Sequence, residues 1–214
     1  MRRLIDVVIA VVALIAAAIP LACAAVAIKL SGRGPILYRQ TRIGRGGVPF
    51  TLFKLRTMPV GSSGPQVTAA ADTRVNAVGR VLRQLKVDEL PQFWNVLRGE
   101  MSLIGSRPEV PRFVARYSAA ERQVLEARPG LASLAQLRFS NEAALLRGHP
   151  DPEDAYARYL MPAKIAADLQ YQRVRTFWSD VRLMVDLMLM VLGRQRHVDR
   201  SFRLPTSQPG DPAR

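Results

Sequence analysis

The sequence predicts a mostly helical α/β protein, in which one compact domain follows an apolar N-terminal helix. Three patterns predict this fold class. No charged residue occurs from Val7 to Ile28, apolar residues recur at helical spacing over residues 75–86, and residues 50–58 alternate as in a half-buried strand. With 214 residues, of which 49% are hydrophobic, the chain can bury one core, and no linker separates two large domains.

The apolar N-terminal run is about as long as the roughly 20 residues that cross the hydrocarbon core of a bilayer. We interpret residues 1–30 as a membrane segment. A cleaved signal peptide is the alternative, because Arg2 and Arg3 precede the run. However, the run is longer than the usual signal-peptide core, and the following sequence lacks the cysteine pattern of secreted proteins, since Cys23 is the only cysteine.

Basic residues flank the apolar run at both ends, with Arg2 and Arg3 before it and Lys29 and Arg33 after it. Since flanks rich in Lys and Arg favour the cytoplasmic side, both ends favour the same face of the membrane. A re-entrant helix that bends at Pro20, where one helical hydrogen bond is removed, satisfies both flanks. An ordinary kinked spanning helix also accommodates a proline. These patterns leave the two topologies open.

The chain is strongly basic, with a formal net charge of +14. Such a charge implies an anionic partner, which can be nucleic acid, an anionic membrane surface or a phosphorylated substrate. No acidic residue occurs between Asp6 and Asp72. Basic residues next to a membrane segment gain about 1 kcal/mol each near an anionic leaflet, which accounts for those closest to Ile28.

The strand pattern over residues 50–58 places two basic residues on an apolar face. Its alternation puts Lys54 and Arg56 on the same side as Phe50 and Leu52. Basic groups on such a face indicate a site, although both side chains could instead reach solvent from the end of the strand. The Gly-rich segment at 44–47 lacks the pattern of a phosphate-binding loop, and its spacing favours a turn.

Two adjacent carboxylates, Asp88 and Glu89, directly precede a predicted helix. Pro91 suits the first helical position, and Gly99 can end the helix in a left-handed conformation. The carboxylates then lie beside the positive end of the helix, where free backbone N–H groups can hold a phosphate. An acidic helix cap, worth up to about 1 kcal/mol, is the alternative.

Two arginines are suited to hold a phosphate. Arg83 lies on the basic amphipathic helix predicted over residues 75–86, and Arg107 lies between turn-forming residues in a loop predicted at 101–109. Further helices are predicted after a capping box at Ser118 and Glu121, from residue 151, and over 177–192 as a packed or interfacial helix. The polar, Pro-rich residues 193–214 are predicted to be disordered.

The combination of these segments resembles the bacterial sugar transferases, small monotopic phosphoglycosyl transferases that load a sugar phosphate onto a polyprenyl phosphate. The most specific match is the run Asp88-Glu89-Leu90-Pro91-Gln92. The other matching segments are 34–40 with Arg42 and Gly44, 54–58, Asp72, Leu82 with Arg83, 94–97, 101–105, 107–109 and 128–130. The resemblance extends from Arg2 to about Leu192.

The resemblance implies a fold, a reaction and a location. The fold is a re-entrant, Pro-kinked membrane helix at 1–30, followed by a compact helical catalytic domain at 31–192 with a short β-hairpin and interfacial helices. The domain lies on the cytoplasmic face of the bacterial inner membrane. With Mg²⁺, Asp88 attacks a UDP-sugar and releases UMP, and the polyprenyl phosphate then displaces the sugar phosphate from Asp88. This is the first membrane step of polysaccharide, lipopolysaccharide or glycoconjugate synthesis.

The resemblance also assigns roles to individual residues. Asp88 and Glu89 become the catalytic and Mg²⁺-binding pair, in which Glu89 holds the metal or steers Asp88. Arg83 and Arg107 become phosphate ligands, and Lys54 and Arg56 become further phosphate-binding site residues. The sequence departs from the family pattern at Ile19, Ser106 and 132–133. The first departure removes a serine hydroxyl that could satisfy backbone groups freed at the bend.

A nonenzymatic, membrane-tethered basic adaptor or nucleic-acid binder is the competing interpretation. It accounts for the charge but gives Asp88 and Glu89 no role, and we therefore expect no nucleic-acid partner. A phosphohydrolase, in which water replaces the lipid acceptor, is a third reading of the same carboxylates. The identity of the sugar, the pathway and the presence of a homodimer stay open.

Overall fold

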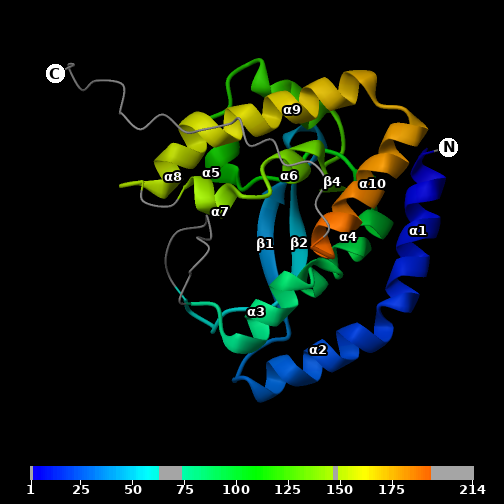
Figure 1. Ribbon diagram of the computed structural model, residues 1–214, viewed down its shortest axis with the longest axis vertical. Helices are drawn as coiled ribbons and strands as arrows, with labels where there is room; N and C mark the ends of the chain where they lie inside the picture. Colours follow the sequence, from blue (N-terminus) through cyan, green and yellow to red (C-terminus); the bar gives the residue numbers. More distant parts are fainter. Residues whose placement is uncertain (1, 63–73, 147–148, 194–214) are drawn as a thin grey trace.

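The computed structural model describes residues 2–62, 74–146 and 149–193, and within them the chain is mostly helical around a small β-hairpin (Figure 1). This confirms a mostly helical α/β fold. Asp72 and the tail from residue 194 onward, for which disorder was predicted, lie outside the described residues.

The N-terminal apolar run forms two helices, α1 (Arg2–Ala16) and α2 (Ala18–Leu30), that are bent by 55°. They form an angled arm along one side of the molecule (Figure 1). The break falls at Ala17, because Pro20 has no N–H to donate to the carbonyl of Ala16 and its ring crowds that carbonyl. Among the described helices none is alone long and apolar enough to cross a bilayer, and α1 and α2 reach that length and composition only together.

The first turns of α1 are fastened to the rest of the domain. The Arg3 guanidinium donates to the carbonyl of Val96 at 2.6 Å, in the last turn of α4 (Gln92–Arg98). The Asp6 carboxylate accepts from the hydroxyl of Ser102 at 2.8 Å. Arg3 therefore caps another helix in addition to flanking the apolar run.

The hairpin consists of β1 (Leu37–Ile43) and β2 (Pro49–Leu55), which pair antiparallel. A short 3₁₀ turn, η1 (Arg45–Gly47), joins them, and its Gly46 and Gly47 have φ of 68° and 79°. Left-handed backbone of this kind favours glycine. The prediction that residues 44–47 form a turn is confirmed.

Two helical segments follow the hairpin. Helix α3 (Ala77–Gln84) begins where the Asn76 side chain accepts from the N–H of Gly79 at 2.6 Å, two residues inside the predicted range. A 3₁₀ turn, η2 (Val87–Glu89), then leads into α4. As predicted, α4 ends at Gly99, with φ of 80°.

Asn95 joins α4 to the hairpin from a fully buried position. Its side-chain oxygen accepts from the N–H of Phe53 at 3.2 Å, and its amide donates to the carbonyl of Thr51 at 2.7 Å. The amide also donates to Glu100 at 2.7 Å. Because this side chain is paired on both its donor and acceptor sides, it fixes β2 against the helix that follows the carboxylate pair.

A second small sheet was not predicted. Strand β3 (Ser102–Ile104) pairs in parallel with β4 (Gly130–Ala132), so the prediction of a loop throughout 101–109 is wrong for three residues. Gly105 and Gly130 allow this approach, because a Cβ on Gly130 would lie 2.0 Å from the backbone nitrogen of Gly105. Strands of three residues are too short to display an alternating pattern.

The remaining helices cover the far end of the hairpin and one side of it (Figure 1). The capping box of Ser118 and Glu121 is present, with the Ser118 N–H 2.7 Å from the Glu121 carboxylate, and Asp151 caps the helix predicted there. The helices are α5 (Pro111–Val114), η3 (Glu121–Glu126), α6 (Leu134–Arg138), α7 (Glu142–Leu145), α8 (Pro152–Ala155), the π-helix η4 (Tyr156–Leu160), α9 (Met161–Val174) and α10 (Phe177–Val191).

Candidate active site

Two of the predicted site residues, Lys54 and Arg107, contact the carboxylate of a third, Glu89. The Nζ of Lys54, at the end of β2, lies 3.0 Å from Glu89 Oε1, and the Nη2 of Arg107, in the loop after β3, lies 2.5 Å from the same oxygen. All three side chains are largely buried. The structure thus brings together residues that are far apart in the sequence.

The charges in this cluster hold Glu89 in its ionised form. Burial raises the pKa of Glu89, but the positive charges of Arg107 and Lys54 outweigh burial and leave the pKa well below its ordinary value. The pKa of Arg107 is raised by Glu89, whereas burial outweighs the same partner at Lys54 and lowers its pKa. Glu89 is therefore a fixed anion between two cations.

Asp88 differs from Glu89 in having an oxygen without a partner. Its side chain is buried, and within the described residues its Oδ1 accepts no hydrogen bond. Burial, followed by the negative charge of Glu89, raises the pKa of Asp88. The Nε2 of Gln92, one helical turn later, is also buried and unpaired. Unpaired buried polar atoms are rare in folded proteins and cost about 1–3 kcal/mol each, so they indicate a place for a ligand.

Arg83 lies at the end of α3 with part of its guanidinium uncommitted. Its Nε donates to the hydroxyl of Thr57 at 2.9 Å, which fixes the plane of the group. Its two terminal nitrogens form no hydrogen bond with other described residues. The positive charge of Arg83 is among those that favour the ionised form of Asp88. These free donors can bind a phosphate.

Arg56 is not brought into this cluster. Its guanidinium donates to the backbone carbonyl of Ile28, in the last turn of α2, at 3.1 Å, and to two carbonyls beyond the helix, those of Gly32 at 2.8 Å and Arg33 at 2.5 Å. The alternation that put Arg56 beside Lys54 does not apply, because β2 ends at Leu55. The alternative that Lys54 and Arg56 both reach solvent from the end of the strand is also wrong, since both side chains are mostly buried.

Two of the N–H groups at the N-terminus of α4, which we predicted to be free, are paired within the chain. The N–H of Phe93 donates to the carbonyl of Leu90 at 3.1 Å, and the N–H of Trp94 donates to that of Pro91 at 3.0 Å. Pro91 precedes the helix instead of being its first residue. Because the 3₁₀ turn runs directly into α4, these two N–H groups are already paired and cannot bind a phosphate.

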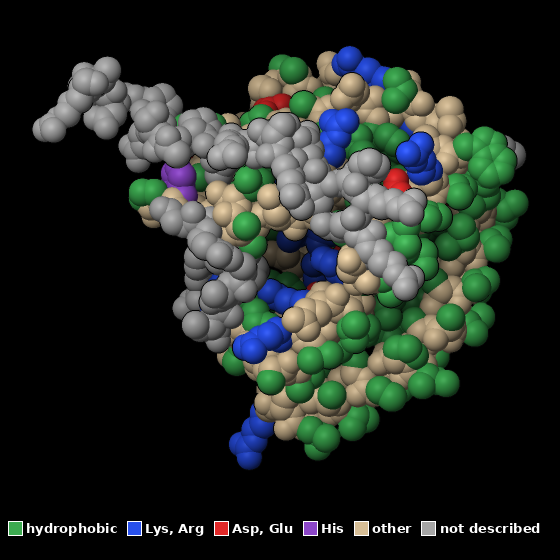
Figure 2. All heavy atoms as spheres, in the orientation of Figure 1, with side chains coloured by type: hydrophobic (Ala, Val, Ile, Leu, Met, Phe, Trp, Pro, Cys, Tyr) green, Lys and Arg blue, Asp and Glu red, His purple; other side chains and the backbone are tan. Residues whose placement is uncertain are grey.

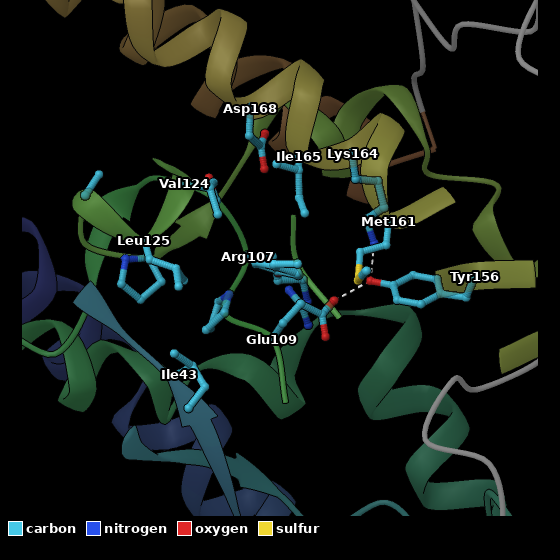
Figure 3. A pocket seen from close by; sticks show the side chains of 15 residues that line it. Ile43, Arg107, Glu109, Val124, Leu125, Tyr156, Met161, Lys164, Ile165 and Asp168 are labelled. Atoms are coloured by element: carbon cyan, nitrogen blue, oxygen red, sulfur yellow. Dashed lines mark hydrogen bonds between the residues drawn. The ribbon is translucent and has the colours of Figure 1, made fainter. Parts of the chain in front are cut away.

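The loop that carries Arg107 also contacts a polar network that was not predicted from the sequence. Figure 3 shows a pocket between the loop that carries Arg107 and Glu109 and the helical residues Tyr156 and Lys164. Its volume of about 30 Å³ is enough for a water molecule. The Glu109 carboxylate accepts from the Tyr156 hydroxyl and lies 3.4 Å from Arg42 Nη1. This network ties the loop to β1, which carries Arg42, and to η4, which carries Tyr156.

The buried Asp168 at this pocket gives the fold a pH dependence. Burial raises its pKa from 3.8 to about 7. Between these values the unfolded chain loses a proton that the folded chain keeps, so the free energy of unfolding falls as the pH rises through this window. Asp168→Asn keeps the oxygen that accepts from the Ala135 N–H. We expect it to remove this fall and to add up to about 4 kcal/mol at pH 8.

Chemical denaturation of the parent and of Asp168→Asn at pH 4 and pH 8 checks this prediction. The two proteins should differ at pH 8 and converge at pH 4. The same loss of stability between pH 4 and pH 8 in both proteins would contradict it.

The site can be tested for its fit to Mg²⁺. Within the described parts of the chain, no group of three or more His, Cys, Asp and Glu side chains could hold a metal ion. Mg²⁺ in phosphate chemistry is commonly held by one or two carboxylates together with substrate phosphates, so such a group is not required. The Asp88 carboxylate, which has an oxygen without a partner among the described residues, fits this mode. The Glu89 oxygens already accept from Arg107 and Lys54.

A buried carboxylate with a free oxygen, next to fixed cations and an arginine with free donors, is the kind of site that acts on phosphate esters. The family model for bacterial sugar transferases matches residues 1–194. The chain therefore belongs to the bacterial sugar transferase family. This match does not support the alternative of a nonenzymatic adaptor or nucleic-acid binder.

The chain is similar to several known transferases. It is 42% identical over 197 residues to the UDP-glucose:undecaprenyl-phosphate glucose-1-phosphate transferase of Caulobacter vibrioides, covering 86% of this chain and 67% of that protein. It is 35% identical over 192 residues to the protein of the same name from Escherichia coli, covering 86% of this chain and 38% of that protein.

A relative named for a different sugar is the UDP-N-acetylgalactosamine-undecaprenyl-phosphate N-acetylgalactosaminephosphotransferase of Aeromonas hydrophila. It is 34% identical over 198 residues, which cover 89% of this chain and 43% of that protein. The chain thus spans about two thirds of the Caulobacter protein and less than half of the other two relatives.

Proposed function

We propose that the chain transfers a sugar 1-phosphate from a UDP-sugar to undecaprenyl phosphate, giving UMP and an undecaprenyl-diphosphate-sugar. Family membership and the names of the relatives support this reaction. Since the chain covers only part of those relatives, its activity by itself belongs to the proposal. The relatives named for glucose and for N-acetylgalactosamine leave the sugar open.

The main structural support for this proposal is that Oδ1 of Asp88 is buried and has no hydrogen-bond partner among the described residues. In the first step this oxygen attacks the sugar-proximal phosphorus of the UDP-sugar. The new O–P bond forms as the P–O bond to UMP breaks, and UMP leaves with the electron pair. In the second step an oxygen of undecaprenyl phosphate attacks the same phosphorus, and the Asp88 carboxylate leaves. Carboxylates are known to form phosphorylated intermediates of this kind.

The neighbouring residues supply positioning and charge, which are the main sources of catalysis in phosphoryl transfer. Arg83 would donate its free guanidinium nitrogens to the donor phosphates. Glu89 would keep Lys54 and Arg107 directed at the site, because both cations contact its carboxylate. The charges of Lys54, Lys86 and Arg83 favour the ionised form of Asp88, which is the nucleophilic form.

Mg²⁺ is part of the proposal through Asp88 and the donor phosphates. When bound, it would neutralise negative charge that develops on the diphosphate. Because Glu89 is paired with two cations, Asp88 is the better protein ligand of the two predicted carboxylates.

We also propose that α1 and α2 enter the cytoplasmic leaflet of the bacterial inner membrane as a re-entrant pair bent near Pro20. Arg3 ties the start of α1 to α4, and Arg56 binds one carbonyl in the last turn of α2 and another just after it. Both ends of the pair therefore attach to the same domain, as a re-entrant segment requires and a spanning helix does not. Hydrophobic side chains cover the part of the surface formed by these helices, whereas basic side chains gather at a hollow (Figure 2).

The test is an assay of purified, detergent-solubilised protein with Mg²⁺ and a panel of UDP-sugars that includes UDP-glucose and UDP-N-acetylgalactosamine. Catalytic release of UMP should require undecaprenyl phosphate. Continued release of UMP without the acceptor would instead identify a phosphohydrolase. If no donor in the panel yields UMP, the proposed function is wrong.

A further inference from the structure

Lys86 directly precedes the turn that carries Asp88 and Glu89, and its backbone is left-handed, with φ of 55°. It occupies the position after the cap of α3, where helices commonly end in this conformation with glycine or asparagine. A side chain with a Cβ is sterically disfavoured there. Every other described residue with φ between 20° and 160° is a glycine, namely Gly32, Gly34, Gly46, Gly47, Gly61, Gly99 and Gly193.

The backbone contacts of Lys86 account for the left-handed turn but not for the lysine. Its N–H donates to the carbonyl of Arg83 at 3.2 Å, and its carbonyl accepts from the N–H of Glu89 at 3.2 Å. A glycine would make both bonds without steric strain. A favourable interaction with the end of the helix dipole does not require lysine here either, because Arg83 already lies in the last turn of α3.

The side chain of Lys86, two residues before Asp88, has no partner among the described residues. Lys86 is exposed, and its ammonium forms no hydrogen bond or ion pair with other described residues. Its charge acts on both Asp88 and Glu89, where it favours the ionised form of each carboxyl group. Strained residues persist when the surrounding structure or the function requires them, and they gather at functional sites.

We propose that Lys86 is a substrate-binding residue whose ammonium binds a phosphate oxygen of the substrate that approaches Asp88. This inference rests on the proposed function for the identity of that substrate. The phosphate can belong to the diphosphate of the sugar donor or to undecaprenyl phosphate, and both present the same oxyanion. Lys86 thus adds a solvent-facing cation to Arg83, Lys54 and Arg107.

Two kinds of Lys86 variant distinguish substrate binding from a purely structural role: variants that relieve the backbone strain and a variant that keeps the positive charge. Lys86→Asn and Lys86→Gly remove the charge and relieve the strain, so Tm should rise by about 2–4 °C. The same variants should bind phosphate about tenfold more weakly at low ionic strength, and this difference should shrink with added salt. Lys86→Arg keeps the charge and should bind like the parent. Arg80→Asn removes another exposed cation of α3 and controls for net charge.

Binding is measured by titration calorimetry with inorganic pyrophosphate and, in detergent, with undecaprenyl phosphate. Weaker binding of pyrophosphate alone by Lys86→Asn places Lys86 at the donor, and weaker binding of the lipid alone places it at the acceptor. Unchanged binding of both probes, or a loss in Lys86→Asn that Arg80→Asn reproduces, overturns the inference. Since these measurements need no turnover, they remain decisive if the parent protein releases no UMP.

Discussion

Replacing Asp88 by asparagine is expected to reduce release of UMP from a UDP-sugar by at least about 10³-fold. The amide oxygen is a far weaker nucleophile toward phosphorus, because it lacks the negative charge of the carboxylate. Stability should be unchanged or slightly higher, since burial and the charge of Glu89 both disfavour the ionised form of Asp88 in the folded protein.

The fold and membrane association of Asp88→Asn are checked by circular dichroism and by sedimentation with vesicles. Asp186→Asn is the matched control, because it makes the same chemical change in a half-exposed aspartate of α10. Its rate of UMP release should equal that of the parent. Parent-like UMP release by a correctly folded Asp88→Asn would remove Asp88 from the mechanism.

Replacing Glu89 by glutamine is expected to affect both stability and activity. The parent carboxylate pairs with Lys54 and Arg107, and the variant leaves these largely buried cations without a countercharge. Because the two cations are not completely buried, we expect the free energy of unfolding to fall by about 2–3 kcal/mol, somewhat less than for a fully buried pair. UMP release should fall by at least about tenfold, since the two cations are no longer held in place.

Chemical denaturation and initial rates measure these two effects. Adding Lys54→Met to Glu89→Gln removes one unpaired cation, so the double variant should regain part of the stability but none of the activity. Glu126→Gln, in an exposed part of η3, is the matched control. A Glu89→Gln protein with parental stability would show that the two ion pairs do not stabilise the fold.

Local signals in the sequence predicted much of the architecture. The proline and glycine around α4, the capping box before η3 and the glycine-rich turn of the hairpin each act over a few residues, and the structure has a helix end, a helix start or a turn at those places. The amphipathic spacing likewise located α3 to within two residues. Such features depend on neighbours in the chain, which a single sequence displays.

The arrangement of the site depends on contacts that local patterns do not encode. Lys54 and Arg56 look equivalent in the alternating segment, yet β2 ends between them, and Arg56 turns to carbonyls at the end of α2 and just after it. Glu89 meets Arg107 only because the loop after β3 passes the 3₁₀ turn. No sequence signal pointed to Asp168, since a lone aspartate in a helix usually faces solvent.

The most direct test of covalent catalysis by Asp88 is intact-mass analysis of the protein after incubation with a competent UDP-sugar and Mg²⁺ in the absence of undecaprenyl phosphate. We expect a mass increase equal to one sugar phosphate, located at Asp88 by peptide mapping and lost when undecaprenyl phosphate is added. Release of UMP with no adduct, or with the adduct on another residue, would contradict it.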